Sequence, residues 1–204
     1  DRLRDQVDDD LRGQADRTMA RLEGVFTQAI DPGEAIAPGA LGGIVARAEQ
    51  AERALNLQTL DLHSVGGELC DYFEALADDR DVRLDNQLHG ELLADQQLLQ
   101  RALGNLLANA VRHADPGSVI SLRRRDEAQC CWLQVHNLGP TIASEHLGKL
   151  FDRFYRVDPS RAEPGDSGGL GLAIVSSIMG LHGGQGRGCS DQTGTVFGLG
   201  FVFD

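Results

Sequence analysis

Residues 98–113, which read LLQRALGNLLANAVRH, limit the fold more than any other stretch of this chain. Their apolar members recur with the 3.6-residue period of an α-helix, at Leu99, Leu103, Leu106, Leu107, Ala110 and Val111. Asp95 precedes the stretch and is a residue type that caps helix N-termini well. The sequence therefore predicts a helix with one face buried in a hydrophobic core.

Polar residues lie along one edge of the same predicted helix. Asn105, Asn109 and Arg112 occupy positions i, i+4 and i+7. Asparagine costs a helix roughly 0.5 kcal/mol relative to alanine, so two of them in an apolar run need a reason. Either both amides are half-exposed and satisfied by hydrogen bonds, or their oxygens hold Mg²⁺ while the arginine binds phosphate. These residues alone leave both explanations open.

The first part of the chain also reads as helical. Between residues 11 and 29, apolar or small residues are spaced alternately by four and three, as in a coiled coil. Proline and glycine residues between 31 and 43 then interrupt the helix. A second helix is expected from around Ile44 to about Leu57. A third is expected at 65–78, with an inner side formed by Leu69, Tyr72, Phe73 and Leu76.

Strand patterns appear only after these helices. Residues 82–88 alternate as a short strand, and 119–125 with 129–136 read as a hairpin. Between the central helix and this hairpin, residues 114–117 read as a turn. Helices followed by mixed strands and helices predict an α+β fold.

Charge and cysteine usage restrict the possible partners. The formal net charge of −12 argues against a broad nucleic-acid or anionic-membrane surface. No run approaches about 18 apolar residues, the length of a membrane span. The four cysteines form no Cys-x-x-Cys pair, which favours a reduced, cytoplasmic chain without a structural metal.

Three further clusters follow the asparagine-bearing helix in order. The first is HNLGPTI at 136–142, where Gly139 lets backbone approach a flat ring and Asn137 offers an amide, although a simple turn would look the same. The second is LFDRFYRVD at 150–158, followed by a loop rich in glycine and proline. The third is GLGLAIV at 169–175, where glycines precede a helix whose first amides could hold phosphate. Glycines also serve tight packing.

Together, NLLANA, LFDRFYRVDPSR, GGLGLAIV and the final GTVF resemble the ATP-binding catalytic domain of sensor histidine kinases of two-component systems. This family shares its nucleotide fold with gyrase, Hsp90 and MutL. The resemblance implies a two-layer α/β sandwich of the Bergerat type, with a mixed sheet covered by helices on one face, preceded by a helical dimerisation stalk. Residues 1–61 would be part of a dimerisation helix and connector, interrupted at 31–43, and residues 62–204 the catalytic domain.

The resemblance also implies cofactors and residue roles. ATP and Mg²⁺ would bind, with Asn109 and Asn105 at the metal. Residues acting at the phosphates would be Asn105, Arg112, Arg153 and Arg156. Other nucleotide contacts would come from Asn109, His113, Asn137, Gly139, Ile142, Phe154, Arg161, Gly169, Leu170, Gly171, Leu172 and Thr195.

Two features depart from the family pattern. Asn137 stands where the family usually has an aspartate that accepts from the adenine amine, so this contact loses its negative charge. A similar replacement resembles the heavy-metal type of sensor kinase. None of the six histidines stands in the phosphoacceptor pattern of a histidine followed by an acidic residue and then a proline. We expect the acceptor helix to lie upstream of Asp1.

The function that the resemblance implies is transfer of the γ-phosphoryl group of ATP to a histidine on that helix, for relay to a response regulator. The intact protein would be a homodimer, with this chain as the cytoplasmic domain of an inner-membrane sensor and no nucleic-acid partner. The alternatives are a nucleotide-binding pseudokinase module that signals by conformation, and an anti-sigma-type serine kinase of the same fold.

Overall fold

The computed structural model describes residues 55–152, 155–158 and 171–203, all within one compact unit. Its helices are α3 (Leu62–Asp79), α4 (Gln96–His113), α5 (Ser144–Leu147) and α6 (Gly171–Leu181). Its strands are β1 (Leu57–Asp61), β2 (Arg83–Gln87), β3 (Glu91–Asp95), β4 (Val119–Glu127), β5 (Cys130–Asn137), β6 (Gln185–Asp191) and β7 (Gly194–Val202). Among these residues no helix is long and apolar enough to cross a membrane.

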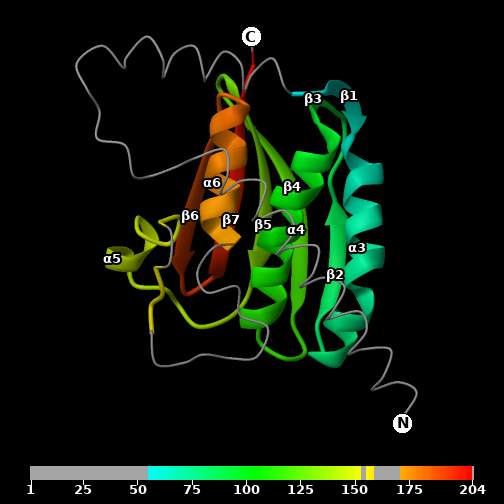
Figure 1. Cartoon of the computed structure of the whole chain (residues 1–204). Coiled ribbons are helices and arrows are strands. Elements are labelled where there is room, and N and C mark those ends of the chain that lie inside the picture. The colour runs from blue at the N-terminus through cyan, green and yellow to red at the C-terminus, as the bar shows by residue number, and fades with distance from the viewer. Residues whose placement is uncertain (1–54, 153–154, 159–170, 204) are drawn as a thin grey trace, which may run out of the picture. The chain divides into compact units, whose positions relative to one another are not determined.

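A five-stranded mixed sheet forms one layer, in the order β2-β4-β5-β7-β6. The β2–β4 pair is parallel and the other pairs are antiparallel. Helices α3, α4 and α6 lie side by side on one face of this sheet (Figure 1). A separate antiparallel pair, β1 with β3, joins residues 57–61 to residues 91–95. The predicted α+β sandwich is therefore confirmed for the described residues.

Helix α4 lies at the centre of the helical layer. All six residues of its predicted apolar stripe are buried, and Ala102 is buried with them. The carboxylate of Asp95 accepts a hydrogen bond from the backbone N–H of Leu98 at 3.1 Å, so the predicted cap is confirmed. The apolar face of α4 packs on β5 and on the neighbouring helices. This packing leaves the polar edge of α4 at the border of the core.

The inner side of α3 was predicted only in part. Leu69 is buried and Phe73 packs against the core, but Tyr72 is 65% exposed and Leu76 is 38% exposed. The buried stripe runs through residues 62, 65, 69, 73 and 77. Tyr72 and Leu76 each precede a stripe position by one residue, which turns them about 100° away from it. The prediction was wrong because an apolar residue next to a stripe was counted as part of it.

The chain before α3 also differs from expectation. Residues 55 and 56 are not helical and Leu57 begins a strand, so a second helix reaching Leu57 is wrong at its end. The backbone N–H of Asn56 donates to the Asp95 carboxylate at 3.1 Å. The rest of that helix, the coiled-coil stretch and the interruption at 31–43 lie outside the described residues.

Candidate functional site

The two asparagines of α4 lie on its half-buried edge, as predicted. The side-chain amide nitrogen of Asn105 donates to the carbonyl oxygen of Gly171 at 3.3 Å. This bond places the first residue of α6 beside the middle of α4. It also uses the nitrogen of the Asn105 amide, so the oxygen of that amide is left for another partner.

The C-terminal end of α4 meets the loop that follows β5. The backbone N–H of Asp115 donates to the carbonyl oxygen of Leu138 at 2.8 Å. A Cβ added to Gly139 would lie 2.4 Å from the carbonyl oxygen of His113, well inside normal contact distance. Glycine is therefore required here because two backbone segments approach closely. The structure shows a close approach of Gly139 to the end of α4, and the approach of a flat ring to Gly139 stays a prediction.

A buried polar cluster lies where β5 and β6 end and β7 begins. Asn137 is 3% exposed and Thr195 is 4% exposed, and the two residues are paired across β5 and β7. The Ser190 hydroxyl lies 2.8 Å from the Thr195 hydroxyl and accepts from the backbone N–H of Ile142 at 2.9 Å. The amide nitrogen of Asn137 donates to the carbonyl oxygen of Leu138 at 3.3 Å. The Asn137 oxygen is therefore the part of this side chain that can accept from a ligand.

Ser190 was missed by the sequence reasoning. It lies at the end of β6, just before the turn into β7, and links the loop after β5 to Thr195. The available signal was the turn composition at 191–194, which marks a hairpin and so places residues 190 and 195 opposite each other. A single serine in an exposed, glycine-rich strand carries no signal of its own.

Hydrogen bonds fix the β6–β7 turn beside this cluster. The Asp191 carboxylate accepts from the backbone N–H and the hydroxyl of Thr193, at 2.7 and 2.6 Å, and these bonds lower the pKa of Asp191. The Thr141 hydroxyl donates to the carbonyl oxygen of Asp191 at 3.1 Å. The turn is thereby tied to the loop after β5.

The segment at 150–158 is described only in part. Phe151 stacks edge-to-face on Phe197 of β7, with ring centroids 6.0 Å apart. The Tyr155 hydroxyl is hydrogen-bonded to the Nδ1 atom of His146 in α5. Arg156 is half-buried. Five predicted site residues lie outside the described part of the chain: Arg153, Phe154, Arg161, Gly169 and Leu170.

The described site residues converge from clusters that are far apart in sequence. The edge of α4, the loop 137–142 and the first turn of α6 are joined by the contacts at Gly171, Leu138 and Gly139. Ile142 and Leu172 are half-buried against the core. Arg112 is half-buried and His113 is exposed at the end of α4. This arrangement offers amide oxygens, backbone amides and arginines, which suit a polar, anionic ligand with a divalent ion.

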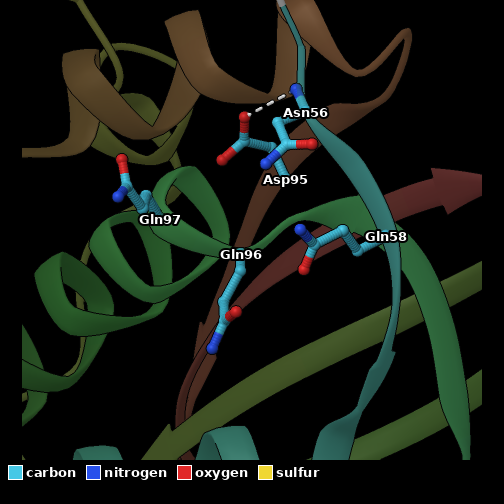
Figure 2. A pocket seen from close by; sticks show the side chains of 5 residues that line it. All are labelled: Asn56, Gln58, Asp95, Gln96 and Gln97. Atoms are coloured by element: carbon cyan, nitrogen blue, oxygen red, sulfur yellow. Dashed lines mark hydrogen bonds between the residues drawn. The ribbon is translucent and has the colours of Figure 1, made fainter.

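A polar pocket lies at the other end of α4 (Figure 2). It is lined by Asn56, Gln58, Asp95, Gln96 and Gln97. A helix rises about 1.5 Å per residue, so this pocket lies about 12 Å or more along the helix from Asn105. None of the predicted nucleotide residues lines it. The pocket is therefore separate from the candidate site.

Comparisons with known proteins agree with this geometry. A family model described as histidine kinase-, DNA gyrase B-, and HSP90-like ATPase matches residues 94–203. The chain is 45% identical over 158 residues to the sensor protein CzcS of Cupriavidus metallidurans, covering 77% of this chain and 33% of that protein. It is 43% identical over 156 residues to the sensor histidine kinase CusS of Escherichia coli O157:H7, covering 75% and 32%. The chain thus spans about a third of the length of these relatives.

Solved structures show the same fold. The nucleotide-free catalytic domain of histidine kinase ThkA matches with a TM-score of 0.63 and 22% identity, over 72% of this chain and 96% of that one. The mycobacterial sensor histidine kinase MprB matches with a TM-score of 0.59 and 25% identity, over 72% and 97%. The resemblance stated from the sequence motifs is confirmed.

Proposed function

Because this chain belongs to the histidine kinase-, DNA gyrase B- and HSP90-like ATPase family, we propose that it is the ATP-binding catalytic part of a sensor histidine kinase. It binds ATP with Mg²⁺ and transfers the γ-phosphoryl group to a histidine on a dimerisation helix outside this chain, for relay to a response regulator. The intact protein is a homodimer at the inner membrane. The observation that carries the proposal is the bond from Asn105 to Gly171, which joins the asparagine edge of α4 to the glycine segment before α6.

The donor set of α4 suits Mg²⁺. Asn105 and Asn109 offer neutral carboxamide oxygens, and the nitrogen of Asn105 is already used by Gly171. No group of three or more His, Cys, Asp or Glu residues that could hold a metal occurs among the described residues. Mg²⁺ in nucleotide sites is commonly held by one or two protein oxygens together with phosphates and water. Asn109 and Asn105 would hold the ion, which would neutralise phosphate charge.

The loop after β5 would bind the base. The buried Asn137 presents its oxygen as an acceptor, since its nitrogen donates to Leu138. An exocyclic amine, as in adenine, is the matching donor. Ile142 would supply apolar contact on the same loop, and His113 would lie against the ring.

The phosphates would extend from the base towards the first turn of α6. Helix N-termini bind anions because their backbone N–H groups lack helical partners. Gly171 and Leu172 begin α6. Arg112 and Arg156 would neutralise the charge that develops on the transferred group. In the transfer, the bond from the γ-phosphorus to its bridging oxygen breaks, a phosphorus–nitrogen bond to imidazole forms, ADP leaves and the imidazole releases a proton.

Ligand-induced stabilisation of the 204-residue chain tests the proposal. ATP with Mg²⁺ at about 100 times its Kd should stabilise the fold by about 2.7 kcal/mol, which raises Tm by about 5–10 °C. Replacing Mg²⁺ with EDTA should remove most of this shift. Asn109→Ala should also remove the Mg²⁺-dependent part, because its oxygen is lost. Gln97→Ala is the matched control, since Gln97 is an exposed amide on the same helix outside the proposed site.

Two results would contradict the proposal. An Asn109→Ala chain with an unchanged Mg²⁺-dependent shift would remove the metal assignment. A wild-type chain that gives no shift at millimolar ATP would favour the signalling module without kinase activity. The chain alone should form no acid-labile, base-stable phosphohistidine with labelled ATP, since none of its histidines stands in the acceptor pattern.

A further inference from the structure

His182 follows the last residue of α6 and makes two hydrogen bonds through its ring. The backbone N–H of Asp95 donates to the Nε2 atom of His182 at 3.1 Å. The Nδ1 atom lies 2.9 Å from the carbonyl oxygen of Ile178, which can only accept. The ring is therefore neutral, with its proton on Nδ1 and a lone pair on Nε2. It also stacks edge-to-face on Phe201 of β7, with centroids 5.5 Å apart.

The bond to Asp95 holds α6 on α4 at a second point. Asn105 binds the first residue of α6, and His182 binds the residue that caps α4. The start of α6, residue 171, is thus held to residue 105, and residue 182, directly after the end of α6, is held to residue 95. The two helices therefore run antiparallel. At about 1.5 Å per residue, the two spans are about 16 and 15 Å, which match. The helices are joined by hydrogen bonds at both ends of their contact.

Apolar packing sets the position of α6 along its own axis less sharply than these hydrogen bonds do. The buried face of α6 consists of Ala173, Val175, Ile178 and Met179. Contacts between apolar side chains are non-directional, whereas a hydrogen bond weakens steeply when its distance or angle changes. A helix transmits an axial shift from one end to the other. A shift at His182 would therefore displace Gly171 by a similar amount.

We propose that His182 is a positioning residue for the nucleotide site: by accepting from the Asp95 amide it sets the axial position of α6, and hence of Gly171 against Asn105. The inference rests on the proposed function, because it takes the start of α6 as part of the phosphate site. His182 itself touches no nucleotide. It acts from the far end of the helix.

Asp95 extends this connection to the preceding chain. One oxygen of its carboxylate accepts from the backbone N–H of Leu98 within α4. The other oxygen accepts from the backbone N–H of Asn56, and Figure 2 shows this second bond. The incoming chain at Asn56, the start of α4 and the end of α6 are therefore joined through a single residue. A displacement of the chain at residue 56 would reach Gly171 through Asp95 and His182.

Two substitutions separate the hydrogen bond from ring packing. His182→Phe keeps an aromatic ring against Phe201 but removes the acceptor. His182→Gln removes the ring but offers an amide oxygen to the Asp95 N–H. The dissociation constant for ATP with Mg²⁺ is measured by titration calorimetry. His182→Phe should raise this Kd about fivefold, which is the equivalent of one lost hydrogen bond. His182→Gln should keep the Kd within about twofold of wild type. Hydrogen exchange at the Asp95 amide should accelerate only in His182→Phe. His89→Gln, an exposed histidine, should change neither quantity.

The outcomes are distinguishable. Wild-type affinity in His182→Phe, or equal loss in both His182 variants, would overturn the inference while leaving the proposed function intact. A wild-type chain that binds no nucleotide would overturn both. Nitrogen NMR of the wild-type chain gives a test that needs no variant: Nε2 of His182 should show the shift of an unprotonated nitrogen, and a proton on Nε2 would refute the geometry.

Discussion

Replacing Gly139 with alanine adds one carbon at the contact between α4 and the loop after β5. The new Cβ would lie 2.4 Å from the carbonyl oxygen of His113 and 3.3 Å from the amide nitrogen of Asn137. Normal contact begins near 3.4 Å, so the backbone segments must separate by about 1 Å. Side-chain rotation cannot relieve a clash with a backbone atom. Overpacking of this kind costs about 1–3 kcal/mol.

The same change should weaken nucleotide binding. Separation of the loop from α4 stretches the 2.8 Å bond from Asp115 to Leu138 and moves Asn137, the proposed acceptor for the base. The loop relieves the strain by moving, and ATP binding must move it back, so ATP affinity should fall about 5- to 150-fold, which corresponds to the same 1–3 kcal/mol. Urea denaturation measures the first effect and titration calorimetry the second.

Gly148→Ala is the matched control for this prediction. Gly148 follows α5 with a φ of −70°, and among the described residues, its two chain neighbours aside, none places an atom within 4 Å of a Cβ added there. Alanine at 148 should leave stability within about 0.5 kcal/mol of wild type and leave ATP affinity unchanged. Equal stability and equal affinity in Gly139→Ala and Gly148→Ala would refute the reasoning from backbone contact.

Two further predictions concern the core. Leu106 is 1% exposed in α4, so Leu106→Ala should destabilise the fold by about 2–5 kcal/mol in urea denaturation. Leu93→Ala, at a position 60% exposed, should cost about 0.5 kcal/mol or less, and equal losses would contradict the core assignment. Burial raises the pKa of the Cys131 thiol to about 11, so the folded chain keeps this proton when the unfolded chain, with a thiol pKa of about 8.5, has lost it. The free energy of unfolding should therefore fall as pH rises above about 8.5. Between pH 7.5 and 9.5, the wild-type chain should lose about 1 kcal/mol more than Cys131→Ala. Equal pH dependence in the two chains would rule this out.

Local sequence patterns were sufficient for α4, for the β4–β5 hairpin and, to within one residue at each end, for β2, whereas β3 was not predicted. The buried stripe of α4, the Asp95 cap and the β4–β5 hairpin follow from periods and turn residues within a few positions of each other. The order of the asparagine, glycine and Gly-Thr clusters was sufficient for the family, because their combination is far more specific than any one of them. Residue types with a defined chemistry, such as amide oxygens and backbone amides, were sufficient to propose an anionic ligand with a divalent ion, and that ligand stays a prediction.

Contacts between distant segments were decided only by the tertiary structure. The pairing of β1 with β3 and the approach of Gly139 to His113 depend on how elements pack, which no local period records. The sequence marks residues 182 and 190 as an ordinary histidine and serine. His182 joins α6 to the start of α4 because folding brings a hydrogen-bond partner 87 residues away within reach. Ser190 joins the loop after β5 to β7 because folding does the same for a partner 48 residues away. Periodicity reports which face of an element is buried, and the partner on that face is set by the packing of the whole domain.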